Sequence, residues 1–194
     1  MAQEILLSPF IKKTEGGLSR DTTDSASAHP CPYPYFGESG YHTNRGWTWS
    51  TWSQYFGVTP DSATQWYTMT DASWDALFTK AFWNKILGDQ INSQRIANMI
   101  GDWFFNSGNY AEIDAQKILD SVFSNHLVVD GCFGTQTISA INSANEPEFY
   151  ADITQKRRDF YQDIVTNNAS QAKYLVGWNN RVNDLVAYSV ALPA

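Results

Sequence analysis

The sequence predicts a mainly α fold with a small irregular or β region after the first helix. From residue 74 onward, apolar side chains recur at the spacing of one helix face. Residues 18–57 instead carry few aliphatic side chains and many Gly, Pro, Ser and Thr, which favours loop with at most a short hairpin. The chain of 194 residues fits one domain, or one domain with a small appended lobe.

The first helix is expected over residues 3–15. Ser8 can cap it, Pro9 suits its first turn, and Gly16-Gly17 ends it. Glu15 then lies on the last turn, where the negative end of the helix dipole opposes ionisation of a carboxyl group. A carboxylic acid that keeps its proton near neutral pH is the general acid that glycosidic bond cleavage needs. The plainer alternative is a surface glutamate at a helix end.

The later helices follow from start signals and apolar periodicity. Thr59-Pro60-Asp61 and Thr70-Asp71 each offer a cap followed by an acidic first turn. The expected helices then run over 74–86, over 90–105 with Gly108 as the stop, over 112–124, and from Thr135 or Thr137 to Ile141. A further helix carries the apolar stripe of Phe149, Ile153, Phe160 and Ile164. The last helix is expected from near Lys173, with Trp178, Val182, Leu185 and Val186 buried. The segment 90–105 is expected to be the central buried helix. Lys156-Arg157-Arg158 is expected to form a basic patch.

Charge and composition exclude several classes of function. The net charge of −7 argues against nucleic acid as a partner, because nucleic-acid binding requires basic patches. No run of about 18 apolar residues predicts a membrane span, and no secretory signal is evident. Cys31 and Cys132 are far apart in sequence and are expected to be free thiols, with a disulfide between them as the alternative. We expect a monomer that needs no metal and no cofactor.

Aromatic residues make up 15% of the chain, and nine of them fall between Tyr33 and Phe56. Aromatic faces pack against sugar CH groups in many carbohydrate-active proteins. We therefore expect the wall of a sugar cleft in this segment. Packing in the core is the alternative role for most of these side chains.

Further candidate residues follow Glu15 in a polar stretch. Asp24 lies nine residues after Glu15 and can be a second carboxylate that holds a water or stabilises an oxocarbenium-like transition state. Asp21 competes for this role, and an Asx turn is the alternative for Asp24. Thr43 can orient a water or a substrate hydroxyl, with a turn or capping role as its alternative.

The order of these motifs resembles glycoside hydrolase family 108, which contains phage and bacterial N-acetylmuramidases. The N-terminal part of the resemblance lies in Glu15-Gly16-Gly17, then Asp24, then Thr43-Asn44-Arg45-Gly46. Its downstream part lies in Ala81-Phe82-Trp83, in the Asp-x-x-x-Asn-x-Gly pattern of residues 102–108, in the Asp-Gly-x-x-Gly-x-x-Thr signature that begins at Asp130, and in Gly177-Trp178-Asn179-Asn180-Arg181. Each motif is weak alone, but five in family order over nearly the whole chain are specific.

The resemblance implies a lysozyme-like helical fold and hydrolysis of peptidoglycan at the β-1,4 bond between N-acetylmuramic acid and N-acetylglucosamine. It implies catalysis by Glu15, Asp24 and Thr43, and substrate binding by Tyr41, Asn44, Trp47, Asp102 and Asn106. Residues 1–124 would form the catalytic region, and residues 125–194 a helical peptidoglycan-binding segment packed on it. For Asp102 and Asn106, support of the active-site loops and of the helix end is the alternative role.

The resemblance also implies a cellular role. A phage or prophage endolysin is made in the cytoplasm and reaches the bacterial cell wall after release through a separate pore. A secretion-linked bacterial muramidase is also compatible with the sequence. Bacterial peptidoglycan is the expected partner in both cases.

The chain departs from the family beside the expected cleft. An insertion that contains His29–Phe36 separates Asp24 from Thr43, and Trp47 stands where an aliphatic residue is more usual. These departures leave open a binding module that has lost catalysis but still holds glycan.

A third reading is an amidase or peptidase in which Cys31 is the nucleophile and His42 its base. Zinc held by these two residues together with His29 is a related possibility, but their spacing fits no standard zinc pattern.

Overall fold

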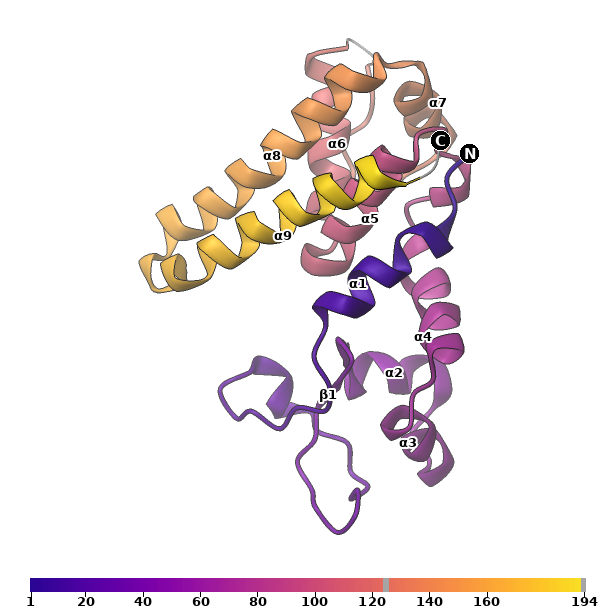
Figure 1. Ribbon diagram of the computed structural model, residues 1–194, viewed down its shortest axis with the longest axis vertical. Helices are drawn as coiled ribbons and strands as arrows, with labels where there is room; N and C mark the ends of the chain where they lie inside the picture. The colour runs from indigo at the N-terminus through magenta and orange to yellow at the C-terminus, as the bar shows by residue number, and fades with distance from the viewer. Residues whose placement is uncertain (124–125, 193–194) are drawn as a thin grey trace. The chain divides into compact units, whose positions relative to one another are not determined.

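The computed structural model describes residues 1–123 and 126–192. Its main elements are α1 (Ser8–Thr14), β1 (Thr43–Asn44), β2 (Trp47–Thr48), α2 (Trp49–Phe56), α3 (Pro60–Tyr67), α4 (Asp71–Phe78), α5 (Gln94–Ser107), α6 (Tyr110–Ser121), α7 (Thr135–Ser143), α8 (Glu146–Asn167) and α9 (Ala172–Ala191). Shorter helices are η1 (Glu4–Leu6), η2 (Ser25–Ala28), η3 (Thr79–Trp83), η4 (Gly88–Gln90) and η5 (Ala169–Gln171). The prediction of a mainly α fold with a small β region is confirmed (Figure 1).

The chain forms two compact units. Unit 1 contains Met1–Phe10 and Leu77–Ala194, and unit 2 contains Ile11–Ala76. The predicted boundary between residues 124 and 125 lies outside the described residues and stays a prediction. Among the described residues, no helix combines the length and the apolar character that crossing a membrane requires.

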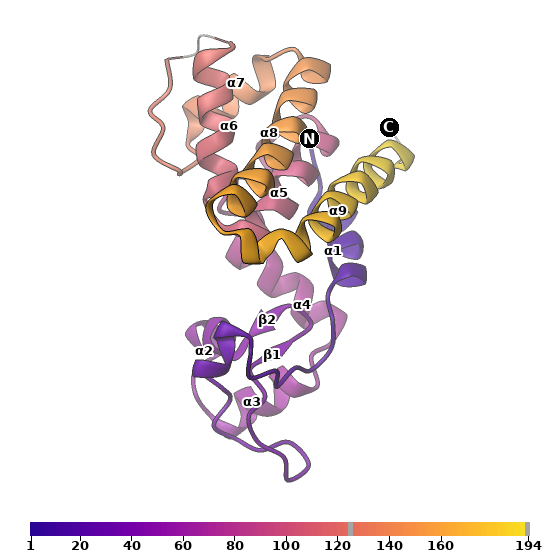
Figure 2. The same ribbon diagram turned by 90° about the vertical axis from the view of Figure 1, so that its left-hand side faces the viewer.

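Unit 1 is built around α5. This helix packs against α6, α8 and α9, while α8 and α9 run side by side as a helical hairpin (Figures 1 and 2). Ser93 caps α5 by accepting a hydrogen bond from the backbone N–H of Ile96, and Gly108, with φ of 67°, ends it. Because nine consecutive residues of α5, from Ile96 to Phe104, are buried, the prediction of a central buried helix is confirmed.

Unit 2 has a core of tryptophans. Trp47, Trp52, Trp66 and Trp74 are each at most 1% exposed, and Trp49 is 4% exposed. The predicted loop over 18–57 is wrong for its last part, because residues 49–56 form α2. Thr48 caps this helix at the N–H of Thr51, and Trp49 and Trp52 face the core from one side of it. Several aromatics expected in a cleft wall are therefore core residues.

Capping predictions were partly correct. Thr59 and Thr70 accept hydrogen bonds from the N–H groups of Ser62 (3.1 Å) and Ser73 (3.2 Å) at the starts of α3 and α4. Ser8 does not cap the first helix, because it is the first residue of α1 and its buried hydroxyl has no partner among the described residues. Gly134, rather than Thr135 or Thr137, precedes α7, and no side chain caps that helix.

The predicted basic patch on α8 is wrong at its central residue. Arg157 is fully buried, whereas Lys156 and Arg158 are partly exposed. In α9, Val182 and Leu185 are buried as predicted, while Trp178 and Val186 stay partly exposed.

Candidate functional site

Glu15 stands at the end of α1. Its N–H donates to the carbonyl of Ile11 (3.1 Å), so it closes the last turn as the sequence predicted. Its side chain is half-buried and lies against Gly46, where a Cβ would be only 2.7 Å from Oε2 of Glu15. The carboxyl group of Glu15 thus rests on the backbone of a turn 31 residues farther along the chain.

That turn joins β1 to β2. Thr43 pairs with Thr48 and Asn44 with Trp47, which leaves Arg45 and Gly46 as a two-residue loop. Both residues have positive φ, 50° and 81°, as a type I′ hairpin turn requires. Glycine adopts this conformation freely, but arginine does so at a cost in conformational energy.

Arg45 is held in this strained conformation by three contacts. Its guanidinium group donates to the carbonyl of Met69 (3.0 Å) and pairs with Asp71 (2.5 Å). Its own carbonyl accepts a hydrogen bond from Nε1 of Trp74 (2.9 Å). The turn that supports Glu15 is therefore fixed to the start of α4 and to the residues before it.

The segment after Glu15 adds to the hairpin. Ser19 exchanges backbone hydrogen bonds with β1, donating to the carbonyl of Thr43 (2.8 Å) and accepting from the N–H of His42 (3.0 Å). Arg45 donates to the carbonyl of Gly17 (3.4 Å). The Glu-Gly-Gly motif and the Thr-Asn-Arg-Gly motif, distant in sequence, are thus neighbours within unit 2.

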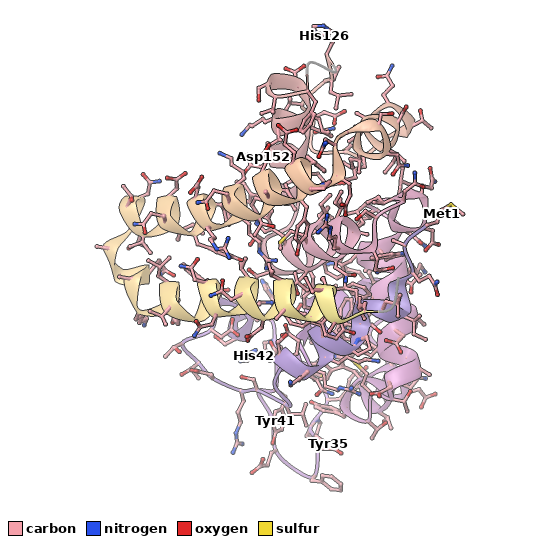
Figure 3. All side chains as sticks on the ribbon, turned by 45° about the horizontal axis from the view of Figure 1, so that its top comes forward. Met1, Tyr35, Tyr41, His42, His126 and Asp152 are labelled. Atoms are coloured by element: carbon pink, nitrogen blue, oxygen red, sulfur yellow. The ribbon has the colours of Figure 1, made fainter. Side chains whose placement is uncertain are left out.

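Thr43 is partly exposed, and its hydroxyl lies 2.9 Å from Nδ1 of His42. His42 is completely buried, and its Nε2 lies 3.1 Å from the backbone carbonyl of Asp21. Figure 3 labels His42 together with its sequence neighbour Tyr41. His42 therefore links β1 to the polar loop that carries Asp21 and Asp24.

Both aspartates of this loop are exposed and engaged in local turns. Asp24 caps η2 by accepting from the N–H of Ala26 (2.9 Å). Asp21 accepts from the N–H (2.9 Å) and the hydroxyl (2.7 Å) of Thr23. The backbone hydrogen bond from Thr23 is the main reason why the pKa of Asp21 lies below its ordinary value.

The predicted binding residues of unit 2 differ in their exposure and in their hydrogen-bond partners. Tyr41 is partly exposed, and its hydroxyl donates to Glu38 (2.7 Å), which raises the pKa of the phenol. Asn44 is buried and donates its amide to the carbonyl of Trp66 (2.6 Å), so it ties the hairpin to α3. Trp47 is 1% exposed, which corrects the expectation that it faces the substrate. Its backbone carbonyl accepts from the indole of Trp66 (3.2 Å).

Asp102 and Asn106 belong to unit 1 and serve its packing. Asp102 is fully buried and pairs with Arg157 (2.7 Å) and Arg181 (2.9 Å), which corrects the expectation that it contacts glycan. Asn106 is exposed and accepts a hydrogen bond from the hydroxyl of Tyr161 (2.9 Å). The Asp-x-x-x-Asn motif of α5 is thus bound to α8 and α9.

The geometry does not support a cysteine nucleophile. Cys31 is 3% exposed and shares a hydrogen bond with Tyr67, whereas both ring nitrogens of His42 contact Thr43 and Asp21. Both cysteines are free thiols. Within the described ranges, no three His, Cys, Asp or Glu side chains are grouped closely enough to hold a metal ion.

Sequence analysis missed the supporting role of three residues. The sequence indicates His42 only as a partner of Cys31 or as a zinc ligand, and Arg45 and Gly46 only as members of a motif. The Asn-Arg-Gly triplet between two short polar-aromatic runs does contain a hairpin-turn signal, with glycine at the second turn position. No sequence signal indicates that this turn supports Glu15.

Comparison with known proteins finds two family matches that together cover most of the chain. The family described as Glycosyl hydrolase 108 matches residues 8–108, and the family described as Predicted Peptidoglycan domain matches residues 112–183. No curated protein matches the chain.

Among solved structures, the one titled "Structure of Brucella abortus SagA" is similar in fold. Its TM-score is 0.71 at 19% sequence identity, with 97% of this chain and 94% of that chain covered. At this identity the likeness shows the fold alone. The first family match spans more than half of the chain and includes Glu15, the β1–β2 hairpin and α5. The chain therefore belongs to glycosyl hydrolase family 108 and is a peptidoglycan hydrolase of the N-acetylmuramidase type.

Proposed function

We propose that Glu15 is the general acid of this muramidase. It would protonate the oxygen of the β-1,4 bond between N-acetylmuramic acid and N-acetylglucosamine as that bond breaks. The observation that carries this assignment is the position of the Glu15 carboxyl group on Gly46, in a turn that Arg45 fixes to α4. A carboxyl group held by packing at a fixed backbone position is preorganised for proton transfer.

Thr43 and Asp24 complete the proposed catalytic set. Thr43 is partly exposed and lies on the strand that pairs with the segment following Glu15, and its hydroxyl would orient the attacking water. Asp24 is the second carboxylate, which stabilises positive charge at the anomeric carbon or holds the water. Its exposure leaves it free to face a glycan chain, while its capping bond to Ala26 fixes one oxygen.

The C-terminal helices are proposed to help hold the glycan. An apolar hollow of about 480 Å³ in unit 1 is lined by residues of α6 and α8 and by the residue that follows α8: Tyr110, Phe160, Asp163, Ile164, Asn167 and Asn168. Aromatic faces combined with amide and carboxylate groups suit a sugar ring, which presents both CH groups and hydroxyls.

In the cell, we propose that the enzyme is made in the cytoplasm, acts as a monomer and reaches the bacterial wall on release. Phage-type lysis is the role that fits such an enzyme. Gel filtration with light scattering tests the monomer, and expression of the chain with and without a co-expressed membrane pore tests the route to the wall. Lysis of the cells without the pore would contradict this route.

Mass spectrometry of soluble fragments from purified peptidoglycan tests the assignment of Glu15. Wild type is expected to release muropeptides with N-acetylmuramic acid at the reducing end. The Glu15→Gln variant, which keeps the shape of the side chain, is expected to release none while still sedimenting with the wall. Equal release by both proteins would remove Glu15 from the mechanism.

A further inference from the structure

The hydrogen bonds of His42 place a proton on one of its two ring nitrogens. Nε2 lies 3.1 Å from the backbone carbonyl of Asp21, and a carbonyl can only accept. Nε2 must therefore carry a proton. The ring is completely buried, and burying an imidazolium is costly unless a charged partner compensates it. The Asp21 carboxylate interacts with the ring through its charge, but its hydrogen bonds come from Thr23 and not from His42.

A neutral ring with its proton on Nε2 has a lone pair on Nδ1. The neighbour of Nδ1 is the hydroxyl of Thr43, at 2.9 Å. The Thr43 hydroxyl must therefore donate its single proton to His42. It keeps two lone pairs, and within the described part of the chain Oγ1 of Thr43 has no other hydrogen-bond partner.

We propose that His42 is a positioning residue that makes the Thr43 hydroxyl an acceptor toward the substrate. This inference rests on the proposed role of Thr43. With its proton directed to His42, Thr43 can accept a hydrogen bond from the attacking water or from a sugar N–H or O–H group. A water that donates to Thr43 has a lone pair left to attack the anomeric carbon.

The backbone reinforces this arrangement. The N–H of His42 donates to the carbonyl of Ser19 (3.0 Å), and its carbonyl accepts from the N–H of Trp49 (2.8 Å) at the start of α2. The ring is therefore held at both its backbone and its side-chain atoms. Through Asp21, the same ring also fixes the polar loop that carries Asp24.

Two substitutions separate the two nitrogens of the ring. His42→Asn keeps an acceptor near the position of Nδ1 and loses the donor to Asp21. His42→Gln keeps a donor near the position of Nε2 and loses the acceptor for Thr43. We expect His42→Gln to lose about 10- to 100-fold in kcat with little change in KM, the effect of a misoriented catalytic group. His42→Asn keeps the acceptor for Thr43 and is expected to lose clearly less than His42→Gln.

The Thr43→Val background tests whether the effect passes through Thr43. In that background, His42→Gln is expected to cause no further loss of muropeptide release. If His42→Gln matches His42→Asn in activity, or if its loss persists beside Thr43→Val, the inference is overturned. If Thr43→Val alone keeps full activity, the role of Thr43 in the proposed function fails as well, so the two failures are distinguishable.

Nitrogen NMR of the wild-type protein provides a test that does not depend on variant folding. The chain contains three histidines, and His29 and His126 are exposed, so the buried ring of His42 gives a distinct pattern of long-range ¹H–¹⁵N couplings. We expect the tautomer with the proton on Nε2 at neutral pH. The opposite tautomer, or an imidazolium, would overturn the proposal.

Discussion

Gly46 lies so close to Glu15 that a Cβ atom at this position would be 2.7 Å from Oε2 and 2.9 Å from Cδ of the glutamate. Gly46 also has φ of 81°, which residues with a Cβ rarely adopt. Two independent requirements for glycine therefore meet at one residue. One concerns the hairpin turn, and the other concerns the space occupied by the proposed general acid.

Gly46→Ala is expected to displace the Glu15 carboxyl group and to strain the turn. We expect a loss of about 1–3 kcal/mol in the free energy of unfolding and a loss of about 100-fold in muramidase activity, because the acid no longer meets the glycosidic oxygen. Thermal unfolding and the rate of muropeptide release measure the two effects. Gly37→Ala is the matched control, since Gly37 has φ of 83° but nothing within 4 Å of its Cβ position. Gly37→Ala should lose some stability and keep its activity. Equal losses of activity in both variants would contradict the proposal that the contact with Gly46 positions the Glu15 carboxyl group.

Asp24→Asn and Asp21→Asn together identify the second carboxylate. Asparagine keeps the oxygen that accepts from Ala26 or from Thr23, so each variant removes a charge and preserves the turn. We expect the rate of peptidoglycan hydrolysis to fall at least about 100-fold for Asp24→Asn and to change little for Asp21→Asn. The reverse result would assign the role to Asp21.

Asp102→Asn is expected to destabilise unit 1. Burial acts to raise the pKa of Asp102, but the charges and hydrogen bonds of Arg157 and Arg181 outweigh it and hold the pKa below its ordinary value. Removing the carboxylate leaves buried positive charge without compensation, at a cost of about 3–5 kcal/mol in the free energy of unfolding. Urea denaturation measures this loss, and Asp184→Asn, at an exposed position of α9, is the control.

The same carboxylate predicts an acid-sensitive step in stability. Because its pKa is lower in the folded than in the unfolded chain, its contribution is complete above the unfolded value of about 3.9 and is lost as pH falls through the folded value. Unfolding curves below pH 4 should show this step in wild type, and the step should be missing in Asp102→Asn. A step of the same size in both proteins would show that other groups cause it.

The contribution of Glu112 to stability depends on pH in the opposite direction to that of Asp102. Burial raises its pKa to about 7 from an ordinary value of 4.5, although its carboxylate accepts from the N–H of Phe133. Its contribution to stability is therefore complete below pH 4.5 and is lost as pH rises to about 7. Glu112→Gln keeps the acceptor for Phe133 and removes the ionisation. We expect it to be more stable than wild type at pH 8 by on the order of 1 kcal/mol, with the gain vanishing near pH 4.

Melting temperatures measured from pH 4 to 8 check this prediction. Glu148→Gln, at an exposed position in the first turn of α8, is the matched control for replacing a glutamate by glutamine. A pH-independent difference between wild type and Glu112→Gln would contradict the raised pKa.

The helices of unit 1 were predictable because each buries an apolar stripe against its neighbours. In α5 the stripe and the stop at Gly108 are both explicit in the sequence. The helix at 49–56 was not predicted, since it follows a stretch rich in Gly, Pro, Ser and Thr and its buried face is made of tryptophans instead of aliphatic residues. Its burial depends on Trp66 of α3, which packs against Trp49 with ring centroids 5.6 Å apart.

The site was predictable only as a set of residue types. Glu15 and Thr43 follow from chemistry and from motif order, but their proximity depends on the pairing of Ser19 with β1. The burial of Arg157 was also not predictable from the sequence, because this residue lies in a charged run that is typical of a solvated surface. Its burial depends on Asp102, which is 55 residues away in sequence.

The buried ion pairs of Asp102 restrict how the two segments that match different families can be exchanged in evolution. The carboxylate lies in the segment that matches the hydrolase family, whereas Arg157 and Arg181 lie in the segment that matches the peptidoglycan domain. Neither segment can be exchanged for an unrelated one without leaving a charge stranded in the interior. Natural recombination should therefore transfer the two segments as a pair, and a peptidoglycan domain taken from another protein will need its own arginines at these two positions.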